Sequence, residues 1–389
     1  MTTETAATRP LPPFTGEHEE LREEIRRFVA EELRPHAHEW EAAEWFPGEV
    51  FHRMAELGLL GLKYPVEYGG RGGGYLEDAV LHEELGRCGS GGLAAGIGAH
   101  IGIATPPIWK FGTGDQKERF LAPAIRGERI AALGITEPGA GSDVAGIRTF
   151  ARRVDGGYVV NGSKTFITNG VRADFVVTAV KTTEEGGHQG ISFLILEREM
   201  DGFETSRKLE KLGWRASDTA ELAFDDVFVP DENLLGEENK GFYLIMANFQ
   251  WERLVMALGS VASMARTVER SVAYASERTA FGRPIGKHQA IRHKIAEMAV
   301  KHEASRSLTY HALRLFISGQ DALREVSSAK LLACRAAVEV ADDAVQLHGG
   351  YGYMREYDVE RALRDARLGP IGGGTDEVMK EIIGKQLGL

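Results

Sequence analysis

The chain has 389 residues, of which 43% are hydrophobic and 26% charged, so it is long enough to form two or three globular domains with sizeable cores. Its formal net charge of −11 argues against a nucleic-acid-binding protein, because neutralising phosphates requires clustered Lys and Arg. The two cysteines, Cys88 and Cys334, form no C-x-x-C pair, which argues against a disulfide framework and a thiolate metal site and favours a reducing, cytoplasmic location.

Residues 1–15 are rich in Thr and Pro and carry neither the apolar core of a signal peptide nor an Arg-rich amphipathic pattern, so we expect a disordered lead. No apolar run approaches the ~18 residues that a membrane-spanning helix needs, and no membrane span is expected. The predicted folded part of the chain therefore begins at residue 16.

Residues 16–130 show the helical spacing of a first domain. Apolar side chains recur every three or four positions from Leu21 to Leu33, which predicts a helix that Pro35 ends. Further helices are predicted over residues 79–85 and 116–125. The Gly-rich segment 69–74 follows no apolar strand and begins no helix, so it is predicted as a loop rather than a dinucleotide-binding fingerprint.

Residues 131–236 change to the pattern of a β domain. Short segments rich in β-branched residues, at 158–160, 175–180 and 191–196, alternate with Gly and Asn turns. Residues 155–157 and 185–187 have the composition of hairpin connections. We therefore expect antiparallel strands in a sandwich or a small barrel.

In residues 237–389 the helical spacing returns, with helices predicted over 241–270 or beyond, 288–318, 328–347 and 377–386. Long helices with short connections indicate a bundle. The expected fold class is α+β and mostly α: an N-terminal helical domain, a middle β domain and a C-terminal helical bundle.

Glu252 lies within an apolar stripe of the first bundle helix. Burial disfavours the charged form of a carboxyl group and prepares it to exchange a proton near neutral pH. One interpretation is therefore a catalytic base; the other is a buried ion pair with Arg253 or Arg215. The residues that share its side of the helix are Ile245, Phe249, Val255 and Met256.

Four polar or Gly-rich segments are ambiguous on their own. Residues 135–143 could present backbone N–H groups to an anion or a polar ring edge, or form a plain turn. In residues 161–170, Phe166 and Thr168 could stack on and hydrogen bond to a flat heterocycle, or belong to a simple hairpin. Segments 278–282 and 346–352 resemble ordinary helix ends, with glycine caps and a solvated Arg278.

Three glycines at 372–374 precede a helix that Thr375 or Asp376 could cap, which makes an N-terminus able to accept a polar group.

Other chemistries find little support. His36 and His38 form an isolated pair, so no metal site is expected. The S-x-x-K spacing of residues 327–330 has no companion motif, which argues against a hydrolase.

Taken in order, the motifs I-T-E-P-G-A-G-S-D, R-T-A-F-G, Q-L-H-G-G and G-G-T-D-E resemble those of the acyl-CoA dehydrogenase family of flavoproteins over nearly the whole chain. The resemblance implies FAD bound between the β domain and a four-helix bundle, and assembly as a homotetramer, a dimer of dimers. It also implies that the cofactor contacts residues of two subunits.

By this resemblance, a set of residues that holds the flavin ring and ribityl chain comprises Ile135, Thr136, Gly141, Ser142, Phe166, Ile167 and Thr168. Most relatives have tryptophan at the position of Phe166. A second set, which contacts the dinucleotide across a subunit interface, comprises Arg278, Phe281, Gln289, Gln346, Gly349 and Gly350, with Thr375 and Glu377 completing the cofactor site.

Many members of the family carry the catalytic base in an I-Y-E-G-T motif, where this chain has Gly373 at the position of the acid. Glycine cannot remove a proton. The long-chain and isovaleryl enzymes instead carry the base in an E-R-L segment of a bundle helix, which corresponds to residues 252–254. The resemblance and the helical spacing therefore both indicate Glu252. Segments 236–243 and 352–354 also resemble the long-chain type most.

The implied reaction is the α,β-dehydrogenation of an acyl-CoA in fatty-acid β-oxidation, with electrons passed to an electron-transfer flavoprotein. Glu252 would remove the α-proton while the β-hydride leaves for flavin N5. Alternatives on the same fold are a flavin-dependent oxidase or monooxygenase, a dehydrogenase of acyl-carrier-protein thioesters, and a flavin-binding scaffold without activity. Residues implied to contact the substrate are Ser142, Tyr243, Gln250, Arg253, Gly373 and Gly374.

Overall fold

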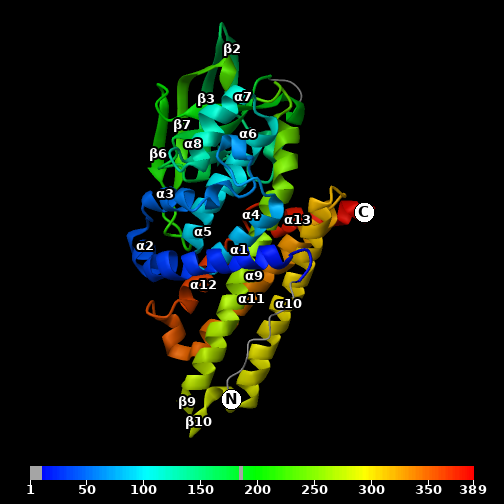
Figure 1. The fold of residues 1–389 in the computed structure, drawn as a ribbon. Coiled ribbons are helices and arrows are strands. Elements are labelled where there is room, and N and C mark those ends of the chain that lie inside the picture. Colours follow the sequence, from blue (N-terminus) through cyan, green and yellow to red (C-terminus); the bar gives the residue numbers. More distant parts are fainter. Residues whose placement is uncertain (1–10, 184–186) are drawn as a thin grey trace.

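The computed structural model describes residues 11–183 and 187–389, in which a group of N-terminal helices, a β domain and a set of long helices follow one another along the chain (Figure 1). The sheet lies at one end of the molecule, and the long helices extend away from it. The N-terminal helices pack against both. None of the helices in this part of the chain combines the length and apolar character that a membrane crossing requires.

The first helix, α1 (Gly16–Phe28), continues without a break into a π-helical turn, η1 (Val29–Leu33), and then into η2 (Arg34–His36) and α2 (Ala37–Ala43). The prediction that Pro35 ends the helical run was wrong. Pro35 lies in the first turn of the short 3-10 helix η2, where the missing N–H breaks no hydrogen bond.

The remaining N-terminal elements include the predicted helices over 79–85 and 116–125, and residues 69–74 form the predicted loop. Their bounds are α3 (Glu49–Glu56), η3 (Leu59–Gly61), η4 (Val66–Tyr68), α4 (Tyr75–Gly86), α5 (Gly91–Ile97), the π-helical η5 (Gly98–Ala104), α6 (Thr105–Phe111), α7 (Gly114–Gln116), η6 (Lys117–Leu121) and α8 (Ala122–Ile125).

The expected disordered lead, residues 1–15, falls partly outside the described residues, which begin at 11. Within the described part, Phe14 is buried, and its ring centroid lies 5.0 Å from that of Tyr310 in an edge-to-face arrangement. The chain therefore packs on the fold a few residues earlier than the composition of the segment predicted, because one aromatic side chain finds a partner on a distant helix.

The β domain is one sheet with the strand order β6-β7-β3-β2-β4-β5-β8, to which β1 adds beside β4. The strands are β1 (Ala131–Gly134), β2 (Phe150–Val154), β3 (Gly157–Thr168), β4 (Phe175–Lys181), β5 (Ile191–Glu197), β6 (Phe203–Lys208), β7 (Thr219–Pro230) and β8 (Leu234–Leu235). Short 3-10 turns, η7 (Val144–Gly146), η8 (Gly187–Gly190) and η9 (Asp231–Asn233), lie between them.

One predicted hairpin connection is present: Val154 pairs with Gly157 across the turn, and Gly156 adopts a left-handed φ of 75°. The other, at 185–187, lies mostly outside the described residues. The antiparallel expectation holds for most strand pairs, but β1 and β2 both run parallel to β4. They pair with successive parts of that strand, so the loop 135–149 between them leaves the sheet and returns to it.

The long helices are α9 (Gly241–Glu277), α10 (Gln289–Ile317), α11 (Leu323–His348) and α13 (Asp376–Gln386), which agree with the four predicted helices. With 37 residues, α9 is about 55 Å long. A small hairpin, β9 (Thr279–Ala280) and β10 (Arg283–Pro284), and a turn, η10 (Ile285–Lys287), join α9 to α10 at the end farthest from the sheet (Figure 1). The turn η11 (Gly349–Tyr353) and α12 (Val359–Ala366) follow α11.

Helix α9 contributes to two of the hydrophobic cores. Leu254 and Leu258 belong to the core shared by the N-terminal helices and the bundle. Leu244 and Ile245 belong to a second core, which the helix shares with one face of the sheet. A single helix thus fixes the sheet and the bundle relative to each other, because its burial in each core removes apolar surface from water.

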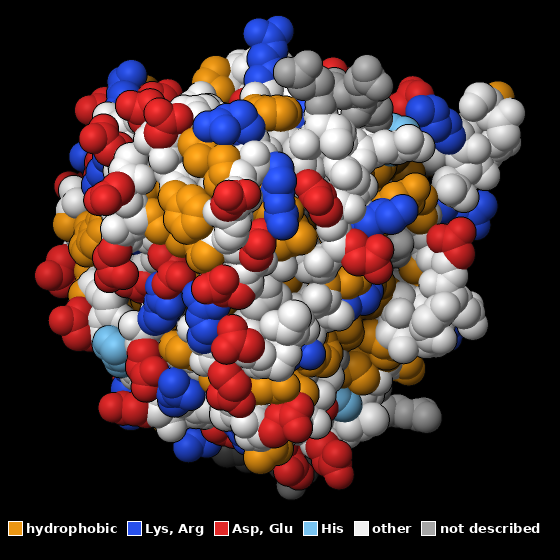
Figure 2. Space-filling view, turned by 90° about the horizontal axis from the view of Figure 1, so that it is seen from above, with side chains coloured by type: hydrophobic (Ala, Val, Ile, Leu, Met, Phe, Trp, Pro, Cys, Tyr) orange, Lys and Arg blue, Asp and Glu red, His pale blue; other side chains and the backbone are white. Residues whose placement is uncertain are grey.

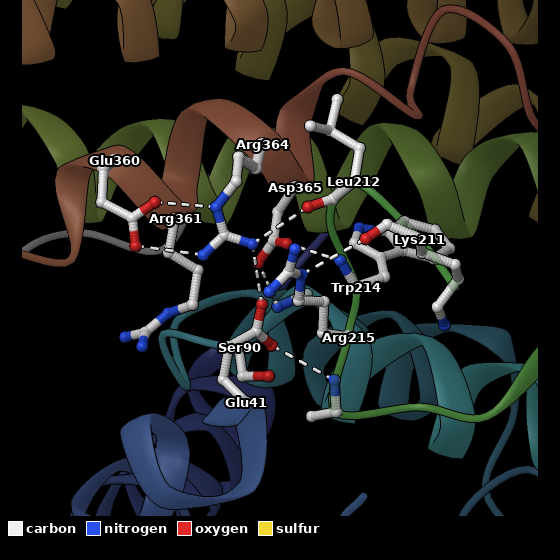
Figure 3. A network of polar contacts seen from close by, with 12 residues as sticks. Glu41, Ser90, Lys211, Leu212, Trp214, Arg215, Glu360, Arg361, Arg364 and Asp365 are labelled. Atoms are coloured by element: carbon white, nitrogen blue, oxygen red, sulfur yellow. Dashed lines mark hydrogen bonds and ion pairs between the residues drawn. The ribbon is translucent and has the colours of Figure 1, made fainter. Parts of the chain in front are cut away.

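A polar junction also joins the three parts of the chain (Figure 3). Asp365 of α12 accepts hydrogen bonds from the backbone N–H of Gly91, at 2.8 Å, and of Trp214, at 2.6 Å. Arg364 donates to Glu41, at 3.1 Å, and to the carbonyl oxygen of Leu212, at 3.1 Å. Burial and the nearby charge of Glu41 raise the pKa of Asp365 to about 6. The junction pins α12 to the N-terminal helices and to the loop between β6 and β7.

Figure 2 views the molecule from the sheet end and shows Lys and Arg side chains lying among Asp and Glu side chains. On this face the charges of both signs are interspersed.

Candidate active site

Glu252 lies in the first half of α9 and is partly buried. Its Oε2 atom is shielded from solvent and has no hydrogen-bond partner among the described residues. Burial raises the pKa of this carboxyl group to about 7, against the opposing positive charges of Arg253 and Lys330. A carboxyl group of this kind can accept or release a proton near neutral pH.

The apolar stripe predicted around Glu252 is present, but only part of it is core. Ile245 is fully buried, whereas Phe249, Val255 and Met256 are partly exposed. The helix instead turns Trp251 and Leu254 into the core, both on the same side of the stripe. Glu252 therefore lies at the edge of the core and not within it.

The alternative of a buried ion pair finds no support in the described part of the chain. Arg215 lies beside Glu44, with 3.8 Å between Nη1 and Oε1, and its Nε donates to the carbonyl oxygen of Lys211. Arg253 places its guanidinium 5.5 Å from the ring centroid of Phe249, and its Nε has no hydrogen-bond partner. The carboxyl group of Glu252 is thus not committed to a structural partner.

Gly373 lies directly beside Glu252. A Cβ atom added at Gly373 would lie 3.7 Å from Oε1 of Glu252 and 2.4 Å from Sδ of Met256, so no larger residue fits without a shift. Gly373 and Gly374 have φ values of +60° and +93°, which glycine adopts at little cost. The Gly-rich segment therefore passes close to α9 because it lacks side chains there.

The backbone N–H groups of Gly373 and Gly374 have no acceptor among the described residues. They precede α13, whose first turn is capped by Thr375, which accepts a hydrogen bond from the N–H of Val378 at 3.3 Å. A helix N-terminus carries a partial positive charge. Free donors next to a proton-accepting carboxyl group form an arrangement suited to removing a proton from carbon beside a carbonyl group.

The loop that leaves the sheet after β1 is held by a buried ion pair. Glu137 accepts hydrogen bonds from the N–H groups of Arg148, at 2.5 Å, and Thr149, at 2.9 Å, and lies 2.8 Å from Nζ of Lys164. Burial lowers the pKa of Lys164 to about 8, although the carboxylate opposes this. These contacts fix the base of the loop, while Gly141 and Ser142 at its tip are exposed.

Phe166 is displayed by an irregularity in the sheet. The pairing of β3 with β7 shifts between Lys164 and Ile167, and within that bulge Phe166 has a left-handed φ of 60° and is 69% exposed. A bulge turns a side chain away from the regular alternation of a strand. A strained aromatic residue held outside the core indicates a binding surface rather than a packing role.

The two predicted groups of cofactor residues are separated in the chain. Ile135 packs in the same core as Leu244 and Ile245 of α9, so the loop after β1 lies near the end of the helix that carries Glu252. Arg278 follows the far end of α9, about 39 Å along the helix from Glu252. Within one chain the second group cannot reach the first.

The second group lies around a cleft of about 500 Å³ at the end of the bundle, which Arg278, Gly349 and Gly350 line. Gln289 begins α10, and Gln346, in the last turn of α11, is exposed but does not line the cleft. Phe281 is 95% exposed at the tip of the β9–β10 hairpin. The N-terminus of α13 contributes Thr375 and the exposed Glu377 near Gly374.

The residues predicted to contact substrate are only partly brought together. Arg253, Gly373 and Gly374 adjoin Glu252, and Nε of Arg253 lies 3.9 Å from the position of a Cβ at Gly374. Tyr243 is 58% exposed. It lies about two and a half helical turns before Glu252, hence on the opposite side of α9. Gln250 is partly buried, and Ser142 lies at the exposed tip of its loop.

Tyr274 and Tyr351, which line the far cleft, were not predicted. The rings of Tyr274 and His348 stack with 4.1 Å between their centroids, and the Arg278 guanidinium lies 5.5 Å from the ring centroid of Tyr351. His348 and Tyr351 belong to the Gly-rich segment 346–352, so aromatic residues interleaved with its glycines were an available signal. Tyr274 lies in the middle of a helical pattern, and nothing in the sequence around it indicates a role in the cleft.

Comparison with known proteins decides the family. Residues 15–128, 132–227 and 239–388 match the N-terminal, middle and C-terminal domain models of acyl-CoA dehydrogenases, in that order. The chain belongs to the acyl-CoA dehydrogenase family. The predicted family and its architecture of a helical, a β and a helical domain are thereby confirmed.

The similarity to individual members of the acyl-CoA dehydrogenase family extends over nearly the whole chain. A mitochondrial isovaleryl-CoA dehydrogenase of Oryza sativa subsp. japonica is 41% identical over 96% of this chain and 92% of the relative. The mitochondrial long-chain specific acyl-CoA dehydrogenase of Mus musculus is also 41% identical, over 96% of this chain and 87% of the relative. The FAD complex of PigA has a TM-score of 0.93 and 30% identity, and covers 97% of this chain and 98% of its own.

Proposed function

We propose that this protein catalyses the FAD-dependent α,β-dehydrogenation of an acyl-CoA thioester to the trans-2-enoyl-CoA, a step of fatty-acid β-oxidation. The observation that carries the proposal is the unpartnered carboxyl group of Glu252, with a pKa of about 7, beside the free N–H groups of Gly373 and Gly374. A base and hydrogen-bond donors for a developing oxyanion are the two groups that this proton removal needs.

The residues of the chain fit FAD at two places. A strained, exposed Phe166 beside the loop after β1 suits a flat ring, and the glycine-lined cleft beside Arg278 suits the other end of a dinucleotide. Bound FAD would supply the acceptor for the β-hydride. The residues proposed to hold it are Ile135, Thr136, Gly141, Ser142, Phe166, Ile167, Thr168, Thr375 and Glu377, with Arg278, Phe281, Gln289, Gln346, Gly349 and Gly350.

Glu252 and the Gly373–Gly374 segment would have separate roles in the reaction. Ionised Glu252 takes the α-proton of the acyl group onto its carboxylate. The amides of Gly373 and Gly374 donate to the thioester carbonyl oxygen, which gains negative charge as the proton leaves. The missing side chain at residue 373 leaves no free space beside the base, because the sulfur of Met256 lies 2.4 Å from the position of a Cβ there.

The proposed assembly follows from the separation along α9. Since Arg278 lies about 39 Å from Glu252 in one chain, we propose that the second group of cofactor residues comes from a second copy, within a homotetramer. Light scattering on the FAD-loaded protein tests this. A monomeric holoenzyme would contradict it.

The decisive experiment is an anaerobic screen of acyl thioesters, including isovaleryl-CoA and long-chain acyl-CoA, monitored by flavin bleaching. We expect wild type to bleach with at least one acyl-CoA and Glu252→Gln to lose about 10²- to 10⁴-fold in rate with FAD still bound. Full activity of Glu252→Gln would show that the base lies elsewhere. If wild type bleaches with no thioester, a non-catalytic scaffold is the better description.

The same preparation separates the related activities. Rapid reoxidation of substrate-reduced enzyme in air with peroxide release would indicate an oxidase, whereas slow reoxidation in air and fast turnover with an electron-transfer flavoprotein would support the proposed acceptor. Comparing matched CoA and acyl-carrier-protein thioesters decides which carrier is recognised. A strong preference for the protein-bound thioester would replace the acyl-CoA assignment.

A further inference from the structure

Lys330 of α11 is a fully buried lysine close to the proposed site. Its Nζ donates to the carbonyl oxygen of Gly374 at 2.5 Å. Among the described residues it forms no ion pair with a carboxylate. It is the lysine of the S-x-x-K spacing, for which the proposed reaction has no use.

An ammonium group with a single neutral partner is costly to bury, and desolvation lowers the pKa of Lys330 accordingly. A well-packed apolar side chain at the same position would avoid that cost. A contribution to stability therefore does not account for the lysine, and its one hydrogen bond is the contact that distinguishes it from an apolar residue.

That hydrogen bond acts on the Gly-rich segment beside Glu252. Gly373 and Gly374 have left-handed backbone conformations, and they have no side chains that would restrict rotation of the backbone. The segment is anchored upstream by the N–H of Gly372 bonding to Leu368 O, at 2.9 Å, and downstream by Asp376 N–H bonding to Pro370 O, at 3.0 Å. In the described part of the chain, the bond from Lys330 is the one hydrogen bond to a backbone atom of Gly373 or Gly374.

We infer that Lys330 is a positioning residue, which holds the Gly373–Gly374 segment so that its free N–H groups stay beside the carboxyl group of Glu252. The inference rests on the proposed function, since it assigns Lys330 a role in that site. Holding the carbonyl of Gly374 toward α11 fixes the plane of the following peptide and restricts the two amides before it.

Lys330 also contributes charge. The groups that bear on Glu252 are Arg253 on its own helix and Lys330 on α11, both of which favour the ionised carboxylate. Cys334, on α11, and Asp376, at the start of α13, act on Lys330 in turn. Removing the ammonium group should therefore leave Glu252 harder to ionise, in addition to freeing the loop.

The experiment compares Lys330→Met with Lys330→Arg, and uses Ser327→Ala as a matched control. Ser327 lies one turn earlier on α11 and is also buried. Among the described residues its hydroxyl donates only to Leu323 O, within the helix, at 2.7 Å. For each FAD-loaded variant we would measure kcat, KM, the pH profile of flavin reduction, and amide hydrogen exchange of the peptide that contains residues 370–380.

For Lys330→Met we expect kcat to fall about tenfold to a hundredfold with a smaller change in KM, and the acidic limb of the pH profile to move to higher pH. Amide exchange should speed up at the hydrogen-bonded N–H groups of Gly372 and Asp376, which anchor the segment on either side. Lys330→Arg should restore the position of the limb and part of kcat. Ser327→Ala should match wild type in all four measurements.

Wild-type kcat, pH limb and exchange in Lys330→Met would overturn the inference. If Lys330→Met does not fold, Lys330→Arg is the deciding variant. The inference would be contradicted if Lys330→Arg shifted the acidic limb of the pH profile to higher pH, or if it lost kcat without any change in amide exchange. Failure of the proposed function is recognised separately, because wild type would then reduce no flavin with any thioester, whereas the exchange comparison needs no substrate.

Discussion

At the scale of single residues, the distinguishing feature of the proposed site is the carboxyl group of Glu252. The carboxyl group has no partner, and burial makes its ionised form costly. In the folded protein its pKa of about 7 lies above the ordinary value of 4.5. Stability from this group is therefore fully present below pH 4.5 and is lost as the pH rises through 7.

Replacing this carboxyl group should consequently have a pH-dependent effect on stability. Glu252→Gln is expected to match wild type at pH 4.5 to 5, where both side chains are neutral, and to be more stable by about 1–3 kcal/mol at pH 8. Urea unfolding at the two pH values measures the difference. An equal effect at both pH values would contradict the raised pKa.

Glu252 was predictable because helical spacing and a short segment, E-R-L, both encode it. Lys330 was not, because its partner is a backbone carbonyl oxygen 44 residues away and no pattern of side chains specifies that contact. Phe166 was predicted as a stacking residue, but its left-handed backbone depends on a bulge opposite β7, which only the paired strand creates.

At the scale of elements, the Gly-rich segment before α13 depends on the absence of side chains. A Cβ at Gly373 would lie 2.4 Å from Sδ of Met256, and the φ of +60° disfavours any L-residue with a side chain. Close packing of the segment on α9 brings the N–H donors to the proposed base, Glu252. The same packing makes the segment intolerant of substitution.

Gly373→Ala should therefore destabilise the protein by about 1–3 kcal/mol and lower kcat, because either Met256 or the loop must move. The matched control is Gly384→Ala in α13, where a Cβ meets nothing within 4 Å and the helix gains from alanine. Thermal unfolding and flavin reduction test both variants. A Gly373→Ala protein as stable and active as wild type would show that the segment is not tightly packed.

Elements with strong periodicity were predicted well, as the agreement of α9, α10 and α11 shows. The helical run that continues past Pro35 was missed, since a proline in a first turn and a proline that ends a helix look the same in sequence. The parallel pairing of β1 and β2 with β4 was missed as well. The turn residues of a hairpin predict pairing only between strands that are adjacent in the sequence, whereas these parallel pairs join strands that are distant in the sequence.

At the scale of the whole molecule, the junction around Asp365 holds the three parts of the chain together (Figure 3). Its carboxyl group satisfies two backbone N–H groups that belong to different parts, those of Gly91 and Trp214. Removing it leaves two partly buried donors without their acceptor, which costs more than a single lost hydrogen bond.

Asp365→Ala is expected to lower the free energy of unfolding by about 2–4 kcal/mol. Asp342→Ala, which removes an exposed acid from α11, should change it by less than about 0.5 kcal/mol. Urea unfolding followed by circular dichroism measures both. Equal effects of the two substitutions would mean that the junction does not hold the parts together.

The assembly has its own test in Phe281, which is 95% exposed in the single chain and belongs to the group of proposed cofactor residues at the far end of α9. Phe281→Asp should leave the fold of the chain unchanged but reduce FAD content and the mass measured by light scattering. Val66→Asp, at another exposed apolar side chain, serves as the control. Retention of full mass and FAD by Phe281→Asp would contradict the proposed intersubunit contact.

Helix α9 carries the proposed base near one end and leads to the far cleft at the other. If a second copy completes the cofactor site, each chain is catalytically incomplete alone. Specific activity would then depend on the enzyme's own concentration and would fall on dilution, even with FAD in excess. A mixture of two variants, one lacking Glu252 and the other altered at Phe281, could regain activity that neither has separately.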